Sequence, residues 1–180
     1  MGNKIDYNKI RLVIFDVDGV MTDGKIIISN DGNESKNFDV QDGLGLVILQ
    51  KLGVKIAIIT GKTSRIVTNR FVALGLDEDD IFQGQKNKVN AYNSLLKKYS
   101  LKDTQIAYMG DDLPDLVLMS KVGLAVAPAN AVSLVTDVAN YVCKKEGGNG
   151  AVREFSEYLL KQMGYYKQVI DSFSEYGGLK

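Results

Sequence analysis

The sequence predicts an α/β fold, a three-layer, doubly wound, Rossmann-like sheet whose strands run mostly parallel. One observation is that short apolar runs alternate along the chain with stretches of helical periodicity, which is typical of βαβ units. Another is that runs such as IAII (residues 56–59) are apolar without interruption, which fits strands covered on both faces of the sheet. The length of 180 residues suits one domain, so we expect a single domain over residues 1–180.

The expected elements follow from these patterns in chain order. Strands are predicted at residues 11–15, 54–60, 105–109, 122–127 and 140–143. Helices are predicted at residues 43–51, 64–74, 89–99, 113–121 and 151–163. Gly75 is a typical helix stop for the second of these helices.

Two segments depart from the alternation. Residues 25–38, KIIISNDGNESKNF, read as strand, turn and strand with Asn-Asp-Gly at the turn, so we expect a β-hairpin flap after the first strand. Residues 147–180 form a C-terminal tail that begins with GGNG and continues into an amphipathic helix. Its last stretch, residues 165–180, predicts either a helix that frays or a segment that docks on another subunit.

Composition narrows the possible functions. The chain has 22 basic and 22 acidic side chains, so its zero net charge predicts neither a nucleic-acid partner nor an anionic membrane. No apolar run approaches the roughly 18 residues of a membrane span, and a single cysteine permits no internal disulfide, so we expect a cytoplasmic protein. Histidine is absent, and acid–base or metal chemistry must therefore use carboxylates and lysines.

Four carboxylates and a hydroxyl follow three of the predicted strands. Asp16 and Asp18 follow the first strand, Thr60 ends the second, and Asp111 and Asp112 follow the third. The functional crevice of an open parallel sheet lies outside the carboxyl ends of its strands, so these groups are expected to meet there. Acids gathered in a cleft repel one another, and a bound cation relieves the repulsion. Oxygen ligands without histidine or cysteine favour Mg²⁺.

A site of this kind suits phosphate chemistry. One aspartate can attack phosphorus and form an aspartyl-phosphate, and a second, two residues on, can protonate the leaving oxygen and then deprotonate water. Gly19 lets the backbone turn and approach the phosphate closely. The hydroxyl of Thr60 and an ammonium group can hold the phosphoryl oxygens.

Some of these acids have a simpler interpretation. Asp111 or Asp112 could cap the helix that follows the third strand. Asp115, one turn further on, could contact a ligand, pair with Lys88, or be a solvated acid in the first helical turn.

Four motifs in this order, FDVDGV, IITGK, a lysine in QKNK, and GDDLPD, resemble the haloacid dehalogenase phosphohydrolase superfamily over nearly the whole chain. The resemblance implies that Asp16 is the nucleophile, Asp18 the acid and base, Thr60 a phosphate ligand and Lys88 the neutralising ammonium. It also implies a Mg²⁺ ion held by Asp16, the backbone carbonyl of Asp18, and Asp111.

A narrower resemblance is carried by DVDGVMTDGKI, NDGNESKNFDVQDG, GDDLPD and GGNGAVRE. Together they are similar to short members of the superfamily that hydrolyse the 8-phosphate of an acidic eight-carbon sugar in lipopolysaccharide biosynthesis. This implies a homotetramer without a large cap domain, in which the flap and the tail help to close a neighbour's site. The expected substrate-binding residues are Asp18, Asp39, Val40, Gln41, Asp42, Gly43, Gly61, Lys62, Arg70 and Lys88, supported by Asp112 and Asp115.

Two alternatives stand beside this expectation. Phosphatases of nine-carbon acid sugars tend to carry an acid after Thr-Gly and a lysine one turn beyond the helix arginine, whereas this chain has Lys62 and Ala73. A non-catalytic phosphorelay receiver is also doubly wound and phosphorylated on an aspartate, but its accepting aspartate ends the third strand. The DxD at the first strand favours a phosphatase.

Overall fold

The computed structural model describes residues 5–179 and contains a six-stranded sheet in the order β5-β4-β1-β6-β7-β8. Every neighbouring pair in this sheet is parallel. The strands are β1 (Leu12–Phe15), β4 (Lys55–Ile59), β5 (Ile81–Phe82), β6 (Ile106–Met109), β7 (Leu124–Ala127) and β8 (Tyr141–Val142). The predicted doubly wound α/β fold is therefore confirmed.

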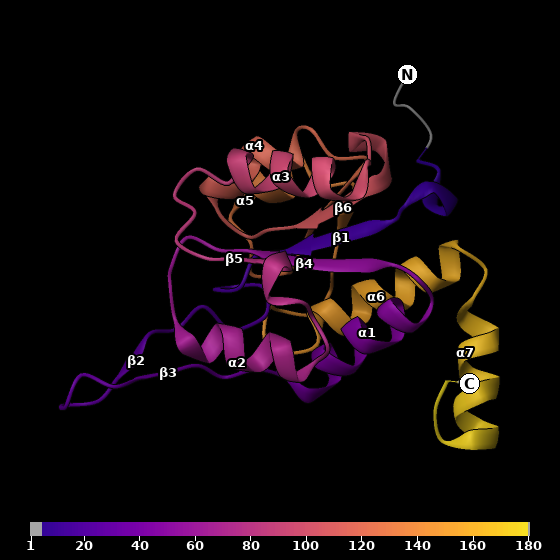
Figure 1. Cartoon of the computed structure of the whole chain (residues 1–180), viewed down its shortest axis with the longest axis horizontal. Coiled ribbons are helices and arrows are strands. Elements are labelled where there is room, and N and C mark those ends of the chain that lie inside the picture. Colours follow the sequence, from indigo (N-terminus) through magenta and orange to yellow (C-terminus); the bar gives the residue numbers. More distant parts are fainter. Residues whose placement is uncertain (1–4, 180) are drawn as a thin grey trace.

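Helices cover both faces of the sheet in three layers (Figure 1). One face packs against α1 (Val40–Lys51), α2 (Arg65–Ala73) and α6 (Ala151–Gln162). The other packs against α3 (Val89–Tyr99) and the short helices α4 (Leu116–Met119) and α5 (Ser133–Thr136). Among the described residues, no helix combines the length and the apolar character needed to cross a membrane.

Strand β1 lies at the centre of the sheet and contributes to both cores. Its four residues are fully buried, and successive side chains point to opposite faces. Val13 and Phe15 join the core under α1, α2 and α6, whereas Leu12 and Ile14 join the core under α3, α4 and α5. This double burial explains why the strand is apolar throughout and why its first polar residue, Asp16, marks its end.

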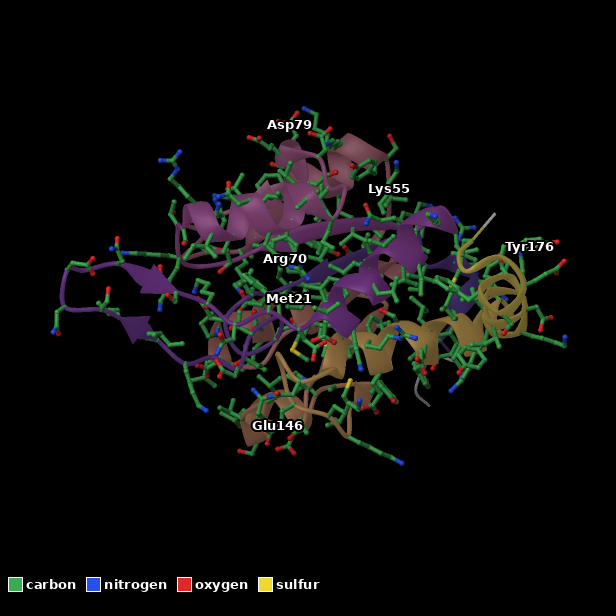
Figure 2. The ribbon with its side chains drawn as sticks, turned by 90° about the horizontal axis from the view of Figure 1, so that it is seen from below. Met21, Lys55, Arg70, Asp79, Glu146 and Tyr176 are labelled. Atoms are coloured by element: carbon green, nitrogen blue, oxygen red, sulfur yellow. The ribbon has the colours of Figure 1, made fainter. Side chains whose placement is uncertain are left out.

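The segment expected to be a flap forms a small hairpin of β2 (Ile27–Ile28) and β3 (Glu34–Ser35), which pair antiparallel and project from the body of the molecule (Figure 1). The last helix, α7 (Tyr166–Tyr176), packs beside α6. Figure 2 shows Tyr176 at the end of the molecule opposite the hairpin.

The structure differs from the expected elements at several points. Helix α1 begins at Val40, three residues before its expected start, and α5 was not predicted. Strand β5 was not predicted, because its two residues are too short to produce a pattern. The helix expected at residues 113–121 begins as a 3₁₀ turn, Leu113–Asp115, and only then becomes α4. Pro114 fits this first turn because the turn requires no N–H from it. The final stretch, left open between two interpretations, contains helix α7.

Candidate active site

An open cleft of about 500 Å³ lies at the carboxyl ends of β1, β4 and β6. Its walls include most of the phosphate-handling residues predicted from the sequence. They are Asp16, Asp18, Thr60, Gly61, Lys62, Lys88, Asp111, Asp112 and Asp115. The parallel sheet thus brings together side chains that are up to about a hundred positions apart in the chain.

The carboxylate of Asp16 is held from two sides. Its Oδ1 accepts a hydrogen bond of 2.7 Å from the N–H of Val17, and its Oδ2 lies 3.0 Å from Nζ of Lys88. The backbone N–H of Asp16 donates to the carbonyl of Met109, which continues the pairing of β1 with β6 beyond the strand. The side chain remains 13% exposed, so one carboxylate is fixed in place and still faces the cleft.

Lys88 connects Asp16 to a buried network. Its Nζ also lies 2.6 Å from Oδ1 of Asp115 and 3.1 Å from the hydroxyl of Tyr108, and that hydroxyl donates to the same Asp115 oxygen at 2.6 Å. Burial alone would lower the pKa of Lys88, but the charges of Asp16 and Asp115 raise it, so the ammonium stays charged.

Asp115 orders the loop that carries Asp111. Its Oδ2 accepts hydrogen bonds from the backbone N–H groups of Asp111, at 2.9 Å, and of Asp112, at 3.2 Å. Asp112 itself caps the following turn by accepting from the N–H of Leu113. Of the interpretations left open by the sequence, capping therefore applies to Asp112, and pairing with Lys88 applies to Asp115.

Three of these carboxylates lie close enough together to hold a metal ion. Oxygens of Asp16, Asp111 and Asp115 all lie within 4.8 Å of one another. Oδ1 of Asp111 is buried without a hydrogen-bond partner among the described residues. Gly19 leaves the space beside this group open, because a Cβ there would overlap the Asp111 carboxylate. A buried oxygen without a donor, in an all-oxygen setting, fits Mg²⁺.

The electrostatics of the cleft agree with this fit. Burial and the neighbouring charge of Asp16 raise the pKa of Asp111 to about 7. Burial, partly offset by Lys88, raises the pKa of Asp16 to about 6. Both carboxyl groups are therefore destabilised as anions until a cation joins them.

The Thr60 loop forms another wall of the cleft. The backbone N–H of Thr60 donates to Phe82, and its carbonyl accepts from Gln85, so the strand end is anchored on both sides. Thr60 is only 2% exposed, whereas Gly61 and Lys62 are exposed at the rim. Lys62 and Lys86 both line the cleft and bring positive charge to its mouth.

The other predicted substrate-binding residues do not line the cleft. Asp39 caps the start of α1, next to the exposed Val40 and Gln41. The buried carboxylate of Asp42 faces the start of α6, where it accepts from the N–H groups of Gly150 and Arg153.

Arg70 and Gly43 lie together near the start of α1, outside the cleft. The Arg70 guanidinium lies over the ring of Phe38 and donates to the carbonyl of Asp39 at 3.3 Å. A Cβ at Gly43 would come within 2.5 Å of Arg70 Nη2, so this glycine makes room for the arginine. Figure 2 shows Arg70 near the middle of the molecule.

Several contributors were missed by the sequence reasoning. Lys36 of the hairpin forms an ion pair with Asp18, and Tyr108 completes the Lys88 network. Asn130 donates to the carbonyl of Gly19 and accepts from the N–H of Gly147. A lysine in a polar hairpin, a tyrosine in a strand and an asparagine in a loop carry no motif, so no local signal could have identified them.

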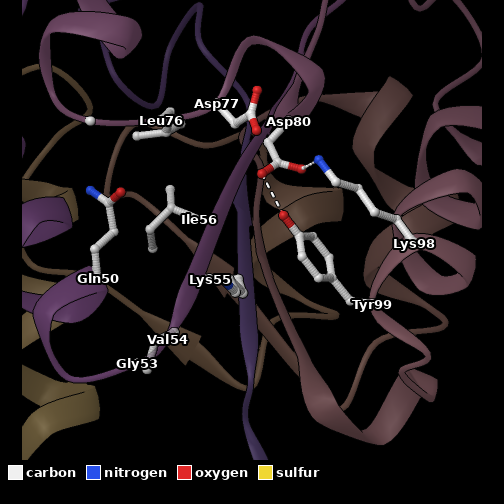
Figure 3. A pocket seen from close by; sticks show the side chains of 11 residues that line it. Gln50, Gly53, Val54, Lys55, Ile56, Leu76, Asp77, Asp80, Lys98 and Tyr99 are labelled. Atoms are coloured by element: carbon white, nitrogen blue, oxygen red, sulfur yellow. Dashed lines mark hydrogen bonds and ion pairs between the residues drawn. The ribbon is translucent and has the colours of Figure 1, made fainter.

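A separate cavity of about 290 Å³ lies at the opposite, amino ends of β4 and β5 (Figure 3). Its buried carboxylate, Asp80, accepts a hydrogen bond of 2.5 Å from the hydroxyl of Tyr99 and pairs with Lys98 at 2.7 Å. These contacts satisfy both oxygens. They tie the turn before β5 to α3 and explain the cluster as structural.

Known proteins resemble this chain in both sequence and structure. A model of haloacid dehalogenase-like hydrolases matches residues 79–155. The 3-deoxy-D-manno-octulosonate 8-phosphate phosphatase KdsC of Escherichia coli is 44% identical over 155 residues, which cover 86% of this chain and 81% of that protein.

Solved structures give the same result. The phosphatase of that name from Moraxella catarrhalis, in complex with magnesium ion, phosphate ion and KDO molecule, is 41% identical, with a TM-score of 0.89 over 93% of this chain and 95% of that one. The one from Yersinia pestis is 42% identical, with a TM-score of 0.86 over 89% and 86% of the two chains.

The fold, the acidic cleft and these similarities establish that the chain belongs to the haloacid dehalogenase-like hydrolases. The relatives that establish this are phosphatases of one kind, named for 3-deoxy-D-manno-octulosonate 8-phosphate. The predicted superfamily is confirmed, and so is the prediction of an enzyme in place of a phosphorelay receiver. Mg²⁺ is the cofactor that the carboxylates fit and that the Moraxella catarrhalis phosphatase contains.

Proposed function

We propose that the protein is a Mg²⁺-dependent phosphomonoesterase that hydrolyses 3-deoxy-D-manno-octulosonate 8-phosphate to the free sugar acid and phosphate in lipopolysaccharide biosynthesis. The observation that carries the proposal is the Asp16 carboxylate, which is held by Val17 and Lys88 and faces the cleft. Beside it lies the Asp111 oxygen that has no hydrogen-bond partner in residues 5–179. The substrate in this proposal is taken from the names of the relatives.

In the first half-reaction, an oxygen of Asp16 attacks phosphorus and the bond from phosphorus to the sugar oxygen breaks. Asp18 gives its proton to that oxygen, and the sugar leaves. Thr60 and the ammonium of Lys88 hold the phosphoryl oxygens during the transfer. Asp16, Asp111 and the carbonyl of Asp18 would hold Mg²⁺, which when bound offsets the repulsion between the nucleophile and the phosphate.

In the second half-reaction, the Asp18 carboxylate takes a proton from water, whose oxygen attacks phosphorus. The bond from phosphorus to Asp16 then breaks, and phosphate leaves the regenerated enzyme. Asp112 and Asp115 support the loop of Asp111 throughout, through the backbone hydrogen bonds described above.

Steady-state phosphate release from the eight-carbon sugar phosphate, with Mg²⁺, tests this assignment. The nine-carbon acid sugar 9-phosphates are the comparison, because they are the alternative substrate class. Asp16→Asn should lose nearly all turnover, since an amide is a poor nucleophile. Wild-type turnover in Asp16→Asn would contradict covalent catalysis, and faster turnover of the nine-carbon substrate would reassign the sugar.

We further propose that the remaining predicted substrate contacts are completed by assembly into a homotetramer in the cytoplasm. Asp39, Val40, Gln41 and Arg70 lie outside the cleft of the single chain. Asp42 and Gly43 also lie outside it, but they are buried and serve the packing of α1 against its neighbours. Ile26 and Ile28 of the hairpin are 61% and 65% exposed, which is costly for isoleucine unless another surface covers them.

Light scattering after size exclusion measures the number of copies. Four copies are expected for the wild type, and Ile28→Glu should yield smaller species. The variant Ile170→Glu, in the exposed part of α7, tells whether that helix also contributes to assembly. A monomeric wild type would contradict the proposal.

A further inference from the structure

Lys36 connects the projecting hairpin to the catalytic cleft. The residue follows β3 directly, and its ammonium forms an ion pair with Oδ1 of Asp18. It also lies 3.3 Å from Oε1 of Glu34, at the start of the same strand. The Lys36 side chain is only 3% exposed, which is unusual for a lysine at the base of a hairpin.

The orientation of Asp18 depends on this contact. Among the interactions of the described residues, Lys36 provides the hydrogen bond to the Asp18 carboxylate, which is 25% exposed at the cleft. Asp16 differs in this respect, because a backbone N–H and Lys88 hold its two oxygens. Because this ion pair holds the Asp18 carboxylate, the position of Lys36 determines the direction in which that carboxylate points.

The ion pair joins two parts of the chain that share no sheet. Asp18 belongs to the loop after the central strand, whereas Lys36 directly follows the two-stranded sheet of the hairpin. The Lys36 side chain is only 3% exposed, and its ammonium has the carboxylates of Asp18 and Glu34 as partners, since an unpaired buried charge is strongly destabilised. The ion pair with Asp18 therefore links the base of the hairpin to the Asp18 carboxyl group.

From this geometry we propose that Lys36 is a positioning residue, which aims the carboxyl group of Asp18 at the leaving oxygen and then at the attacking water. The inference rests on the proposed function, because it takes Asp18 as the acid and base. Lys36 acts through Asp18 and makes no contact with the phosphate. Any surface or ligand that fixes the hairpin also fixes the direction of Asp18.

The proposal predicts a specific kinetic effect. Lys36→Met should lower kcat roughly 10- to 100-fold, within the range expected when a general acid is misplaced. KM should remain within about twofold, because the phosphate-holding groups are unchanged. In single turnovers, the loss should be larger for an alkyl phosphate than for p-nitrophenyl phosphate, whose leaving group needs little protonation. A purely structural defect would not depend on the leaving group.

Matched variants isolate the ion pair. Lys25→Met removes the same charge from the same hairpin, but Lys25 is 79% exposed and lies 3.8 Å from Asp23, so wild-type kcat is expected. Glu34→Gln removes the other partner of Lys36 and should also keep wild-type kcat. Lys36→Arg should recover part of the activity, and it replaces Lys36→Met in the kinetics if that variant does not fold.

The decisive measurement is a double-mutant cycle with Asp18→Asn. If Lys36 acts through Asp18, adding Lys36→Met to Asp18→Asn causes no further loss in the single-turnover rate. A further loss equal to that in the wild-type background, or a raised KM with unchanged kcat, would overturn the proposal. Wild-type turnover in Asp18→Asn would instead contradict the proposed function. An impaired Asp18→Asn beside an unaffected Lys36→Met would contradict only the role of Lys36.

Discussion

The carboxylate of Asp42 accepts a hydrogen bond of 2.8 Å from the backbone N–H of Arg153, although 111 positions separate the two residues. The same carboxylate accepts from the N–H of Gly150, so an acid in the first turn of α1 caps the start of α6. Gly150 has no side chain that could serve as a cap. Asp42, which belongs to another helix, supplies the N-terminal cap of α6 that a residue next to the helix usually supplies.

Asp42→Ala should therefore lower the free energy of unfolding by about 0.5–2 kcal/mol, the usual cost of losing an N-terminal cap. Chemical denaturation measures the change. Asp171→Ala is the matched control, because Asp171 is 59% exposed and, among the described residues, forms an ion pair with Lys167 on the surface of α7. An equal effect of both substitutions would contradict the cap.

Asp42→Asn separates the charge of this group from its hydrogen bonds. Burial raises the pKa of Asp42 to about 6 in the folded protein, above its ordinary 3.8. The folded state thus holds this proton more tightly, and the stability it provides is present below pH 4 and lost as the pH rises through 6. Asparagine does not titrate. The Tm of the variant relative to wild type should therefore rise from pH 4.5 to pH 7.5, and a constant difference would contradict the shift.

The contact between Gly147 and the loop after the nucleophile leaves no room for a side chain. A Cβ at Gly147 would overlap the carbonyl oxygen of Gly19, and the Gly147 N–H is held by Asn130. Gly147→Ala should cost about 1–3 kcal/mol by overpacking and reduce turnover as well, because the displaced loop carries Asp18. Gly178→Ala, which meets no atom within 4 Å, is the control for both denaturation and kinetics.

Mg²⁺ should stabilise the protein more at high pH than at low pH. Burial raises the pKa of Asp111 to about 7 and the pKa of Asp16 to about 6. At a pH below these values, Mg²⁺ must displace protons from the two carboxyl groups in order to bind. In the metal-free protein the same shifts mean that stability is lost as the pH rises through 6 and 7, and Mg²⁺ restores it.

Thermal melts with and without Mg²⁺ at pH 5.5 and pH 8 measure the effect. The increase in Tm should be larger at pH 8. Asp111→Asn should remove most of it, whereas Asp79→Asn, a change in an exposed turn, should not. Equal increases at both pH values would argue against a site built from these two carboxylates.

The sequence predicted the sheet because its strands are buried on both faces and their apolar runs are long enough to recognise. It predicted Asp16, Asp18, Thr60 and Asp111 because strand ends converge in a parallel sheet, a rule that depends only on chain order. The roles of Asp42 and Arg70 could not be found in this way. Their partners depend on how α1 meets α6 and α2, and packing between distant helices leaves no local pattern.

The same limit applies to the hairpin. Its turn was visible in Asn-Asp-Gly, but in the sequence Lys36 resembles any lysine at the end of a short strand, and only the structure shows its ion pair with Asp18. The resemblance to a known family added roles to residues in motifs. It assigned no role to Tyr108 and Asn130, because these residues lie outside the motifs. They contribute by hydrogen bonds to residues within the motifs.

The tie between the GGNG segment and the loop after β1 affects how the enzyme is made. Asp16, Asp18, Thr60, Lys88 and Asp111 all emerge from the ribosome before residue 112, but the backbone of Gly147 and Gly148 that braces their central loop follows some 35 positions later. The growing chain therefore contains all five of these residues before it contains the segment that braces their loop.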